Sequence, residues 1–391
     1  MFMSTTNYIS ERALNIPKSA IHEMTRLSKQ VDDVAFLSWA KPTSDTPSHI
    51  KDAAVKAIQD GKTAGYSETT GLYELREAIA KKLKSINGIN ATSDEVLVTI
   101  GAIEGLSAAI LATVNPGEEV IIPVPGYSTH IRQVEIAGGI PVLVQTNEEE
   151  GFSLDLEAIE KAANKNTKAI VLSNPNNPTG AVYSEKELKE LASIIKKKDM
   201  IAIIDEAYEY FTYEDNSHVS LATLPEMHDR VISVFTFTKT YAMTGWRIGY
   251  VHARRDWIPQ MTKMHIPMAI CAPVVSQYAA LAALTGPQEY IEVFRDHYKT
   301  VREVMCYRLS RLDNIFDYQV PKGSYLMFPK IIHPDRKDSL KFAKKLLKDI
   351  AVSTTPGIAF HGEGHVRMSF CVPEEMVTKA FDRMENYFGM K

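Results

Sequence analysis

Three short polar motifs follow successive apolar runs in the middle of the chain. Residues 173–180 read SNPNNPTG, residues 205–208 read DEAY, and residues 236–247 read TFTKTYAMTGWR. A lysine amine can form an imine with an aldehyde, a buried carboxylate can hold a protonated ring nitrogen, and an arginine can bind a phosphate through its guanidinium fork. The motifs therefore contain the groups that an aldehyde cofactor with a ring nitrogen and a phosphate requires.

Lys239 and Asp205 are the two residues on which this chemistry depends. Lys239 follows the apolar run 231–234, so its amine is expected at the end of a strand. Asp205 closes the apolar run 201–204, where burial would raise the pKa of a carboxyl group, so its charge is favourable only beside a cation such as a pyridinium. The alternatives are a surface lysine at 239 and a helix N-cap at 205.

The order and spacing of these motifs resemble those of the class I/II aminotransferases, in the aspartate aminotransferase superfamily of pyridoxal-phosphate enzymes, over nearly the whole chain. The resemblance implies that Lys239 holds pyridoxal 5'-phosphate as a Schiff base and carries the substrate α-proton, while Asp205 keeps the pyridine nitrogen protonated. It also implies that Asn177 and Tyr208 donate hydrogen bonds to the phenolic oxygen of the cofactor. The phosphate ligands that it implies are the side chains of Thr236, Thr238 and Arg247.

Further positions complete the cofactor site that the resemblance implies. The backbone amides of Ala102 and Ile103 would bind the phosphate at the start of a helix expected from Glu104, a segment that is otherwise a tight turn. Tyr127 would stack on the pyridine ring, with ordinary core packing as the alternative. Tyr66 would reach the phosphate of a neighbouring subunit, so the resemblance implies a homodimer with shared active sites.

Arg367 is the residue expected at the substrate end of the site. A guanidinium fork suits a planar carboxylate, and the resemblance places Arg367 on the substrate α-carboxylate with Asn177 nearby, whereas the alternative is a structural salt bridge. Trp39 and Ala40 would also face the substrate, where the family has a Gly-Glu-Pro-like turn. Here Ala40 replaces the glycine and Lys41 replaces the acidic or amide residue, a departure that bears on the shape of the substrate pocket.

The sequence leaves the substrate side chain open. Lys41 and Lys263 are candidates for binding a second carboxylate, and Trp39 and Tyr325 for binding a larger side chain. We expect an aminotransferase that moves the amino group of an L-amino acid, with aspartate or a broad or aromatic range favoured, to a 2-oxo acid such as 2-oxoglutarate.

Two other functions share the cofactor residues. One is a fold-type I lyase that catalyses C–S cleavage or β-elimination. The other is a pyridoxal-phosphate-binding regulatory module without catalysis; such regulators carry a helix-turn-helix extension, for which the chain has no room before residue 30. A complete set of predicted cofactor residues argues against an inactive member of the family.

Seven short β-branched runs separated by helix-like segments must position these residues. They are residues 96–99, 120–122, 142–144, 169–172, 201–204, 231–234 and 248–251. Continuous apolar runs of this kind predict an α/β fold with a mostly parallel sheet buried on both faces. By resemblance this is the large domain of fold type I, at 49–285, with an N-terminal arm and part of the small domain at 1–48 and a smaller α+β domain at 286–391.

Composition excludes several kinds of partner. The net charge is −4 and no basic block is long, so nucleic acid is not expected. No stretch approaches the roughly 20 apolar residues of a membrane span, and the three cysteines have no metal-ligand spacing. We expect a cytoplasmic protein without a metal ion.

Overall fold

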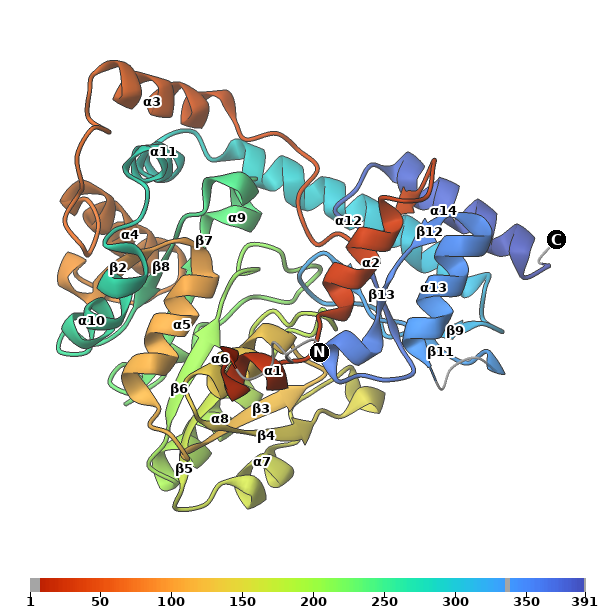
Figure 1. Ribbon diagram of the computed structural model, residues 1–391, viewed down its shortest axis with the longest axis horizontal. Helices are drawn as coiled ribbons and strands as arrows, with labels where there is room; N and C mark the ends of the chain where they lie inside the picture. The colour runs from red at the N-terminus through yellow and green to blue at the C-terminus, as the bar shows by residue number, and fades with distance from the viewer. Residues whose placement is uncertain (1–7, 335–337, 390–391) are drawn as a thin grey trace, which may run out of the picture.

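The computed structural model describes residues 8–334 and 338–389, and a seven-stranded sheet forms its centre (Figure 1). The strand order is β2-β8-β7-β6-β5-β3-β4, and only β8 runs antiparallel to its neighbours. The strands are β2 Val96–Thr99, β3 Glu119–Val124, β4 Ile140–Gln145, β5 Thr167–Ser173, β6 Ile201–Asp205, β7 Val231–Thr236 and β8 Gly249–His252. All seven predicted runs therefore lie in one sheet, and the α/β prediction is confirmed.

Successive side chains of the central strands enter two different hydrophobic cores. Ile201 and Ile203 of β6 pack in the core beneath α5, α6 and α10, which we call the α5 side of the sheet. Ala202 and Ile204 pack in the core beneath α4 and α8, which we call the α4 side. This alternation follows from the two-residue period of a strand.

Strand β4 differs from the expectation of burial on both faces. Ile140 and Leu143 are among its exposed residues, because β4 pairs only with β3 and forms the edge of the sheet. The other six strands are almost entirely buried.

Helices cover both faces of the sheet. They are α3 Ser48–Gln59, α4 Tyr73–Ile86, α5 Gly101–Thr113, α6 Ser128–Ile136, α7 Leu156–Ala162, α8 Glu185–Lys197, α9 Phe237–Thr240, α10 Ile258–Ala269 and α11 Val274–Thr285. Amphipathic character explains their packing: in α8, Leu188, Leu191 and Ile195 recur at helical spacing and are buried, while Ser184 caps the N-terminus.

The C-terminal part packs beside the sheet around a core of its own (Figure 1). It contains α12 Glu289–Ser310, β9 Phe316–Asp317, β10 Leu326–Met327, β11 Lys330–Ile331, α13 Ser339–Ile350, β12 Val352–Ser353, β13 Thr355–Pro356, β14 Val366–Ser369 and α14 Glu374–Tyr387. Helix α12, of 22 residues, begins this part of the chain. The proposed domain boundaries themselves stay a prediction.

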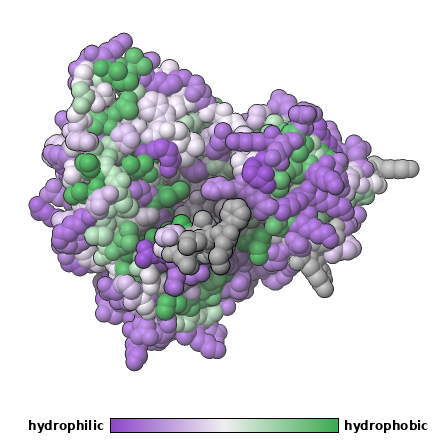
Figure 2. Space-filling model, in the orientation of Figure 1, coloured by the Kyte–Doolittle hydropathy of each residue, from purple (hydrophilic) through white to green (hydrophobic). Residues whose placement is uncertain are grey.

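The N-terminal segment contains α1 Glu11–Asn15, α2 Ala20–Ser28 and β1 Ala35–Phe36. Strand β1 pairs in parallel with β12, so this segment is joined to the C-terminal part. Within 8–334 and 338–389, no helix is both long and apolar enough to cross a membrane. Figure 2 shows apolar side chains on the surface around α3, α5 and α10, and Val55, Ile58, Ile103, Ile266 and Met268 are exposed there.

Candidate active site

A cavity of about 580 Å³ lies at the carboxyl ends of the central strands, and it brings together most of the predicted site residues. Its lining includes Trp39, Ala40, Ala102, Ile103, Tyr127, Asn177, Asp205, Tyr208, Thr236, Thr238, Lys239, Arg247 and Arg367. These thirteen predicted residues and Lys41 thus line one cavity, whereas Tyr66, Lys263 and Tyr325 do not.

Strand register places the three motifs side by side. Ser173 at the end of β5 pairs with Asp205 at the end of β6, and Asp205 pairs with Val234 in β7. Carboxyl ends of adjacent parallel strands meet at one edge of a sheet, which is where open α/β sheets bind ligands. Lys239 follows β7 in the short helix α9, whose N-cap, Thr236, accepts a hydrogen bond from the amide of Thr238.

Lys239 lies partly open to the cavity, and its ammonium group has no carboxylate partner among the described residues. Its Nζ donates a hydrogen bond to the carbonyl oxygen of Ala40 at 2.7 Å. Burial lowers the pKa of Lys239 to about 8, and the nearby guanidinium groups of Arg367 and Arg247 act in the same direction. A substantial fraction of this amine is therefore neutral near pH 8, as a nucleophile requires.

Asp205 is buried and hydrogen-bonded on both oxygens. Its Oδ2 lies 3.3 Å from Nε2 of His130, and its Oδ1 accepts a hydrogen bond from the amide of Ala207 at 3.2 Å. The residues after Asp205 form a turn rather than a helix, so the N-cap alternative is wrong. Asp205 instead points to the cavity, on the α5 side of the sheet.

Tyr208 and Asn177 face the same space from neighbouring strand ends. Tyr208 is 3% exposed, and burial raises its pKa, so its hydroxyl group stays protonated and can donate a hydrogen bond. Asn177 is buried, and its Oδ1 accepts a hydrogen bond from Arg367 at 3.1 Å. The Tyr127 ring meets the His130 ring edge to face at 5.5 Å.

Gly101 opens helix α5, three residues earlier than the predicted start at Glu104. Gly101 has φ +70°, and a Cβ atom there would lie 2.7 Å from an Nη atom of Arg247. Only glycine fits this conformation and this close approach. Ala102 and Ile103 consequently occupy the first turn of α5, where free amides and the helix dipole favour an anion beside the guanidinium of Arg247.

Arg367 on β14 is a deeply buried cation whose hydrogen bonds go to neutral oxygen atoms. It is 3% exposed and donates hydrogen bonds to the carbonyl oxygen of Ser38, at 2.9 Å, and to Asn177. Among residues 8–334 and 338–389 no carboxylate lies within ion-pair distance of it, and its Nε is without a partner. Burial lowers the pKa of this guanidinium. The salt-bridge alternative for Arg367 is therefore wrong in the part of the chain that the structure describes.

Comparison with known proteins places this architecture in a family. The family described as "Aminotransferase class I and II" matches residues 33–384. The chain is 38% identical to an aspartate aminotransferase of Pyrococcus abyssi, covering 98% of this chain and 99% of the relative, and 35% identical to aromatic-amino-acid aminotransferase 2 of Thermococcus litoralis, covering 98% and 99%. Among solved structures, aspartate aminotransferase of Thermus thermophilus with maleate superposes with a TM-score of 0.92 at 34% identity, over 97% of this chain and 99% of that chain.

The chain belongs to the class I and II aminotransferases. It is therefore an enzyme of the transferase class, and the fold type inferred from the sequence is confirmed. Members of this family use pyridoxal phosphate, and the aminotransferases that the chain resembles act on amino acids and oxo acids.

The N-terminal segment of this aminotransferase closes one wall of the cavity. Trp39 stacks on Phe36 with ring centroids 4.4 Å apart, and the Lys41 ammonium lies 4.7 Å from the Trp39 ring. Lys41 lines the cavity, as does Lys29 from the end of α2. These side chains reach the site because β1 is paired with the C-terminal part.

Three predicted candidates lie outside the cavity of this aminotransferase. Tyr66 is 80% exposed, and Lys263 on α10 is exposed and hydrogen-bonded to Gln260. Tyr325 is fully buried behind Ala40, to whose carbonyl oxygen it donates a hydrogen bond at 3.3 Å, so it has no free surface for a substrate side chain.

His130 and Ser38 are site residues that the sequence analysis missed. His130 is three residues after Tyr127, a spacing that places both at the start of α6 facing one direction, and this spacing is a signal that could have been used. Ser38 contributes only its carbonyl oxygen to Arg367, and no residue type signals that role.

Proposed function

We propose that this aminotransferase binds pyridoxal 5'-phosphate covalently at Lys239 and uses it to move the amino group of an L-amino acid to 2-oxoglutarate. The observation that carries the proposal is a charge imbalance. Lys239, Arg247 and Arg367 line the cavity with a single carboxylate, that of Asp205, and none of the three cations pairs with a carboxylate of the described chain. A phosphate and a substrate carboxylate would supply the missing anions.

The residues present fit this cofactor. Gly101 leaves room beside Arg247 that a side chain would fill, at the free amides of Ala102 and Ile103. Thr236 and Thr238 lie at the same end and would add hydroxyl donors. When bound, pyridoxal phosphate supplies an aldehyde and an electron-withdrawing ring that stabilises negative charge on the substrate α-carbon.

Each remaining residue has a defined task in this proposal. Lys239, with its lowered pKa, would supply a neutral amine to hold the cofactor aldehyde and would carry the substrate α-proton. Asp205, oriented by His130, would hold the protonated ring nitrogen, and Tyr127 would pack on the ring. Tyr208 and Asn177 would donate hydrogen bonds to the phenolic oxygen.

Arg367 is proposed to bind the substrate α-carboxylate. Its guanidinium is already oriented by Asn177 and Ser38, so little entropy is lost when a carboxylate binds. Ala40 and Trp39 would border the same substrate. The names of the relatives favour aspartate or an aromatic amino acid as donor, with Lys41 available for a second carboxylate and Trp39 for a ring.

We further propose a homodimer with shared active sites. Tyr66 is exposed at the surface and does not line the cavity of its own chain, so its side chain is free to reach a second copy. The apolar surface around α3, α5 and α10 offers an area that a second copy could cover (Figure 2).

Absorbance between 300 and 500 nm tests the proposal. The purified protein is loaded with pyridoxal phosphate and mixed in turn with L-aspartate, L-tyrosine, L-alanine or L-cysteine, and then with 2-oxoglutarate. A donor should convert the visible band to a shorter wavelength, 2-oxoglutarate should restore it, and glutamate should form. Ammonia and pyruvate in place of a new amino acid would indicate the lyase alternative, and a loaded protein without a visible band would refute attachment at Lys239.

A further inference from the structure

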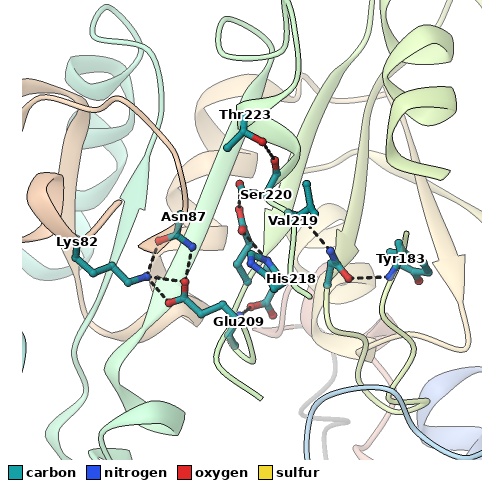
Figure 3. A network of polar contacts seen from close by, with 12 residues as sticks. Lys82, Asn87, Tyr183, Glu209, His218, Val219, Ser220 and Thr223 are labelled. Carbon is teal, nitrogen blue, oxygen red and sulfur yellow. Dashed lines mark hydrogen bonds and ion pairs between the residues drawn. The ribbon is translucent and has the colours of Figure 1, made fainter. Parts of the chain in front are cut away.

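Behind the cavity, on the α4 side of the sheet, lies a second buried polar layer to which the proposed chemistry assigns no task. It begins with the residue after Asp205. Because side chains alternate along β6, Asp205 points to the α5 side and Glu206 to the α4 side. The Glu206 carboxylate is fully buried, accepts a hydrogen bond from the hydroxyl of Ser220 at 2.9 Å, and lies 2.9 Å from Nε2 of His218 (Figure 3).

Three residues further, Glu209 enters the same layer and meets two residues of the α4 region. Its carboxylate accepts hydrogen bonds from Lys82 Nζ at 2.5 and 2.6 Å and from Asn87 Nδ2 at 2.6 Å. Lys82 also donates to Asn87 Oδ1 at 2.8 Å, so each of the three side chains is bonded to the other two (Figure 3). We call this set the back triad.

The back triad is enclosed. The side chains of Lys82 and Glu209 are each 7% exposed, and the Lys82 ammonium lies 4.6 Å from the ring of Phe235 in β7. Both charges have lost most of their water, so their attraction is not weakened as it would be at the surface. Buried ion pairs of this kind are, however, often replaceable by apolar side chains without loss of stability. A contribution to stability therefore does not by itself explain why these charged side chains are buried here. A role in fixing the position of a neighbouring residue would explain it.

The residue whose geometry the triad would fix is Tyr208, which lies next to Glu209 in a tight turn. The amide of Glu209 donates a hydrogen bond to the carbonyl oxygen of Glu206, and the amide of Phe211 donates to the carbonyl oxygen of Tyr208. Tyr208 points into the cavity from this turn while Glu209 points to the opposite side. A clamp on Glu209 consequently restrains the direction of Tyr208.

We propose that Lys82, Glu209 and Asn87 are positioning residues that hold the Tyr208 hydroxyl on the cofactor, an inference that rests on the proposed function. Tyr208 donating to the phenolic oxygen would stabilise the unprotonated form of the cofactor–lysine linkage and so lower the apparent pKa of the visible band. Loss of the clamp should raise that apparent pKa although no residue of the cavity has changed.

The test compares two buried ion pairs. Lys82→Met/Glu209→Leu removes the charges of the back triad together, and Arg308→Met/Glu385→Leu removes the buried pair between α12 and α14, far from the cavity. The cofactor-loaded proteins are titrated by absorbance against pH and melted thermally. We expect the triad variant to raise the apparent pKa of the band by about one unit and to lower kcat, and the control variant to leave the titration unchanged.

The outcomes separate the two proposals. No visible band in the wild-type protein would refute the proposed function. A normal wild-type band together with an unchanged titration in the triad variant would refute the positioning inference, whatever the melting temperature does. If the double variant does not fold, Asn87→Ala replaces it in the test, because this change removes the hydrogen bonds of Asn87 to Glu209 and Lys82. Asn87→Ala should also raise the apparent pKa of the band, and an unchanged apparent pKa would refute the inference.

Discussion

Two buried arginines, Arg367 in the cavity and Arg308 between α12 and α14, differ in the charge of the groups that they contact. Arg308 forms ion pairs with the carboxylates of Glu385 and Asp382, whereas Arg367 donates to an amide oxygen and a carbonyl oxygen and meets no carboxylate among the residues described. A buried charge that is paired within the chain stabilises the fold, but one left unpaired is costly until a ligand supplies the counterion. The difference separates an arginine that is paired within the fold from one whose charge is left available to a ligand.

The same contrast holds for two buried lysines. Lys82 on the α4 side of the sheet forms an ion pair with Glu209, while Lys239 at the cavity donates to the carbonyl oxygen of Ala40 and has no ion pair with a carboxylate of the described residues. Burial lowers the pKa of both amines. For Lys82 the Glu209 carboxylate opposes that shift, whereas the lowered pKa of Lys239 favours the neutral amine that the proposed chemistry needs.

The largest expected effect is that of Lys239→Ala. Loss of the nucleophile and proton carrier should reduce turnover by about 10⁴-fold or more, since acid–base catalysis alone contributes up to that amount. Borohydride reduction followed by mass spectrometry should find no cofactor on the variant protein. Lys263→Ala, at an exposed lysine of α10, is the control and should be labelled like the wild type. Equal labelling of Lys239→Ala would contradict the assignment.

Next in size is the contrast between Arg367→Gln and Arg308→Gln. Arg367→Gln should lower kcat/KM by roughly 10²–10³-fold, because a carboxylate would lose its charged partner, with a change in unfolding free energy below about 1 kcal/mol. Arg308→Gln should leave kcat/KM unchanged. It should lower the free energy of unfolding by about 3 kcal/mol, because Asp382 and Glu385 lose this ion-pair partner. Steady-state kinetics and urea unfolding measure both. Equal losses of stability would remove the distinction between the two arginines.

The third prediction concerns pH and the cofactor-free protein. The folded pKa of Lys239, about 8, lies below the ordinary value of 10.5, so between these values the unfolded chain binds more protons and stability rises with pH. Relative to Lys239→Met, the wild type should gain at most about 3 kcal/mol over this window. Urea unfolding of both proteins at about pH 7.5 and about pH 10 measures the difference. A wild type that loses stability relative to Lys239→Met would show that Lys239 has an anionic partner.

The smallest expected effect is that of Gly101→Ala. An added Cβ atom would be strained by the left-handed backbone and would push against the Arg247 guanidinium, at a cost of about 1–2 kcal/mol. Because this guanidinium is proposed to bind the phosphate, we expect roughly tenfold weaker binding of pyridoxal phosphate. Equilibrium dialysis of the cofactor measures this. Gly61→Ala is the matched control, since Gly61 also has a positive φ but no atom near its Cβ position, and it should leave cofactor binding unchanged.

Much of the fold followed from local patterns. The seven β-branched runs predicted the strands of the sheet, because a strand buried on both faces needs apolar residues at every position. The spacing from Thr236 to Arg247 predicted one end of the site, since residues close in sequence after one strand must lie close in space. Helix α5 was predicted three residues late, because a glycine with positive φ at its first residue gives no helical signal.

Other features depended on packing between distant segments. The sequence could not show that Arg367 bonds to Asn177 and not to a carboxylate of the described residues, that Tyr325 is buried behind Ala40, or that Lys82 and Glu209 meet on the α4 side of the sheet. Each is a relation between residues more than 100 positions apart, and it exists only after the C-terminal part and α4 have packed on the sheet.

The sequence by itself thus indicated the type of chemistry, because residue types and short spacings predict a lysine for an imine, a carboxylate and a set of phosphate ligands. Only the tertiary structure decided which buried charges are paired and which remain available to a ligand. The physical reason is that pairing depends on distances of a few ångströms between elements, and local sequence does not encode those distances.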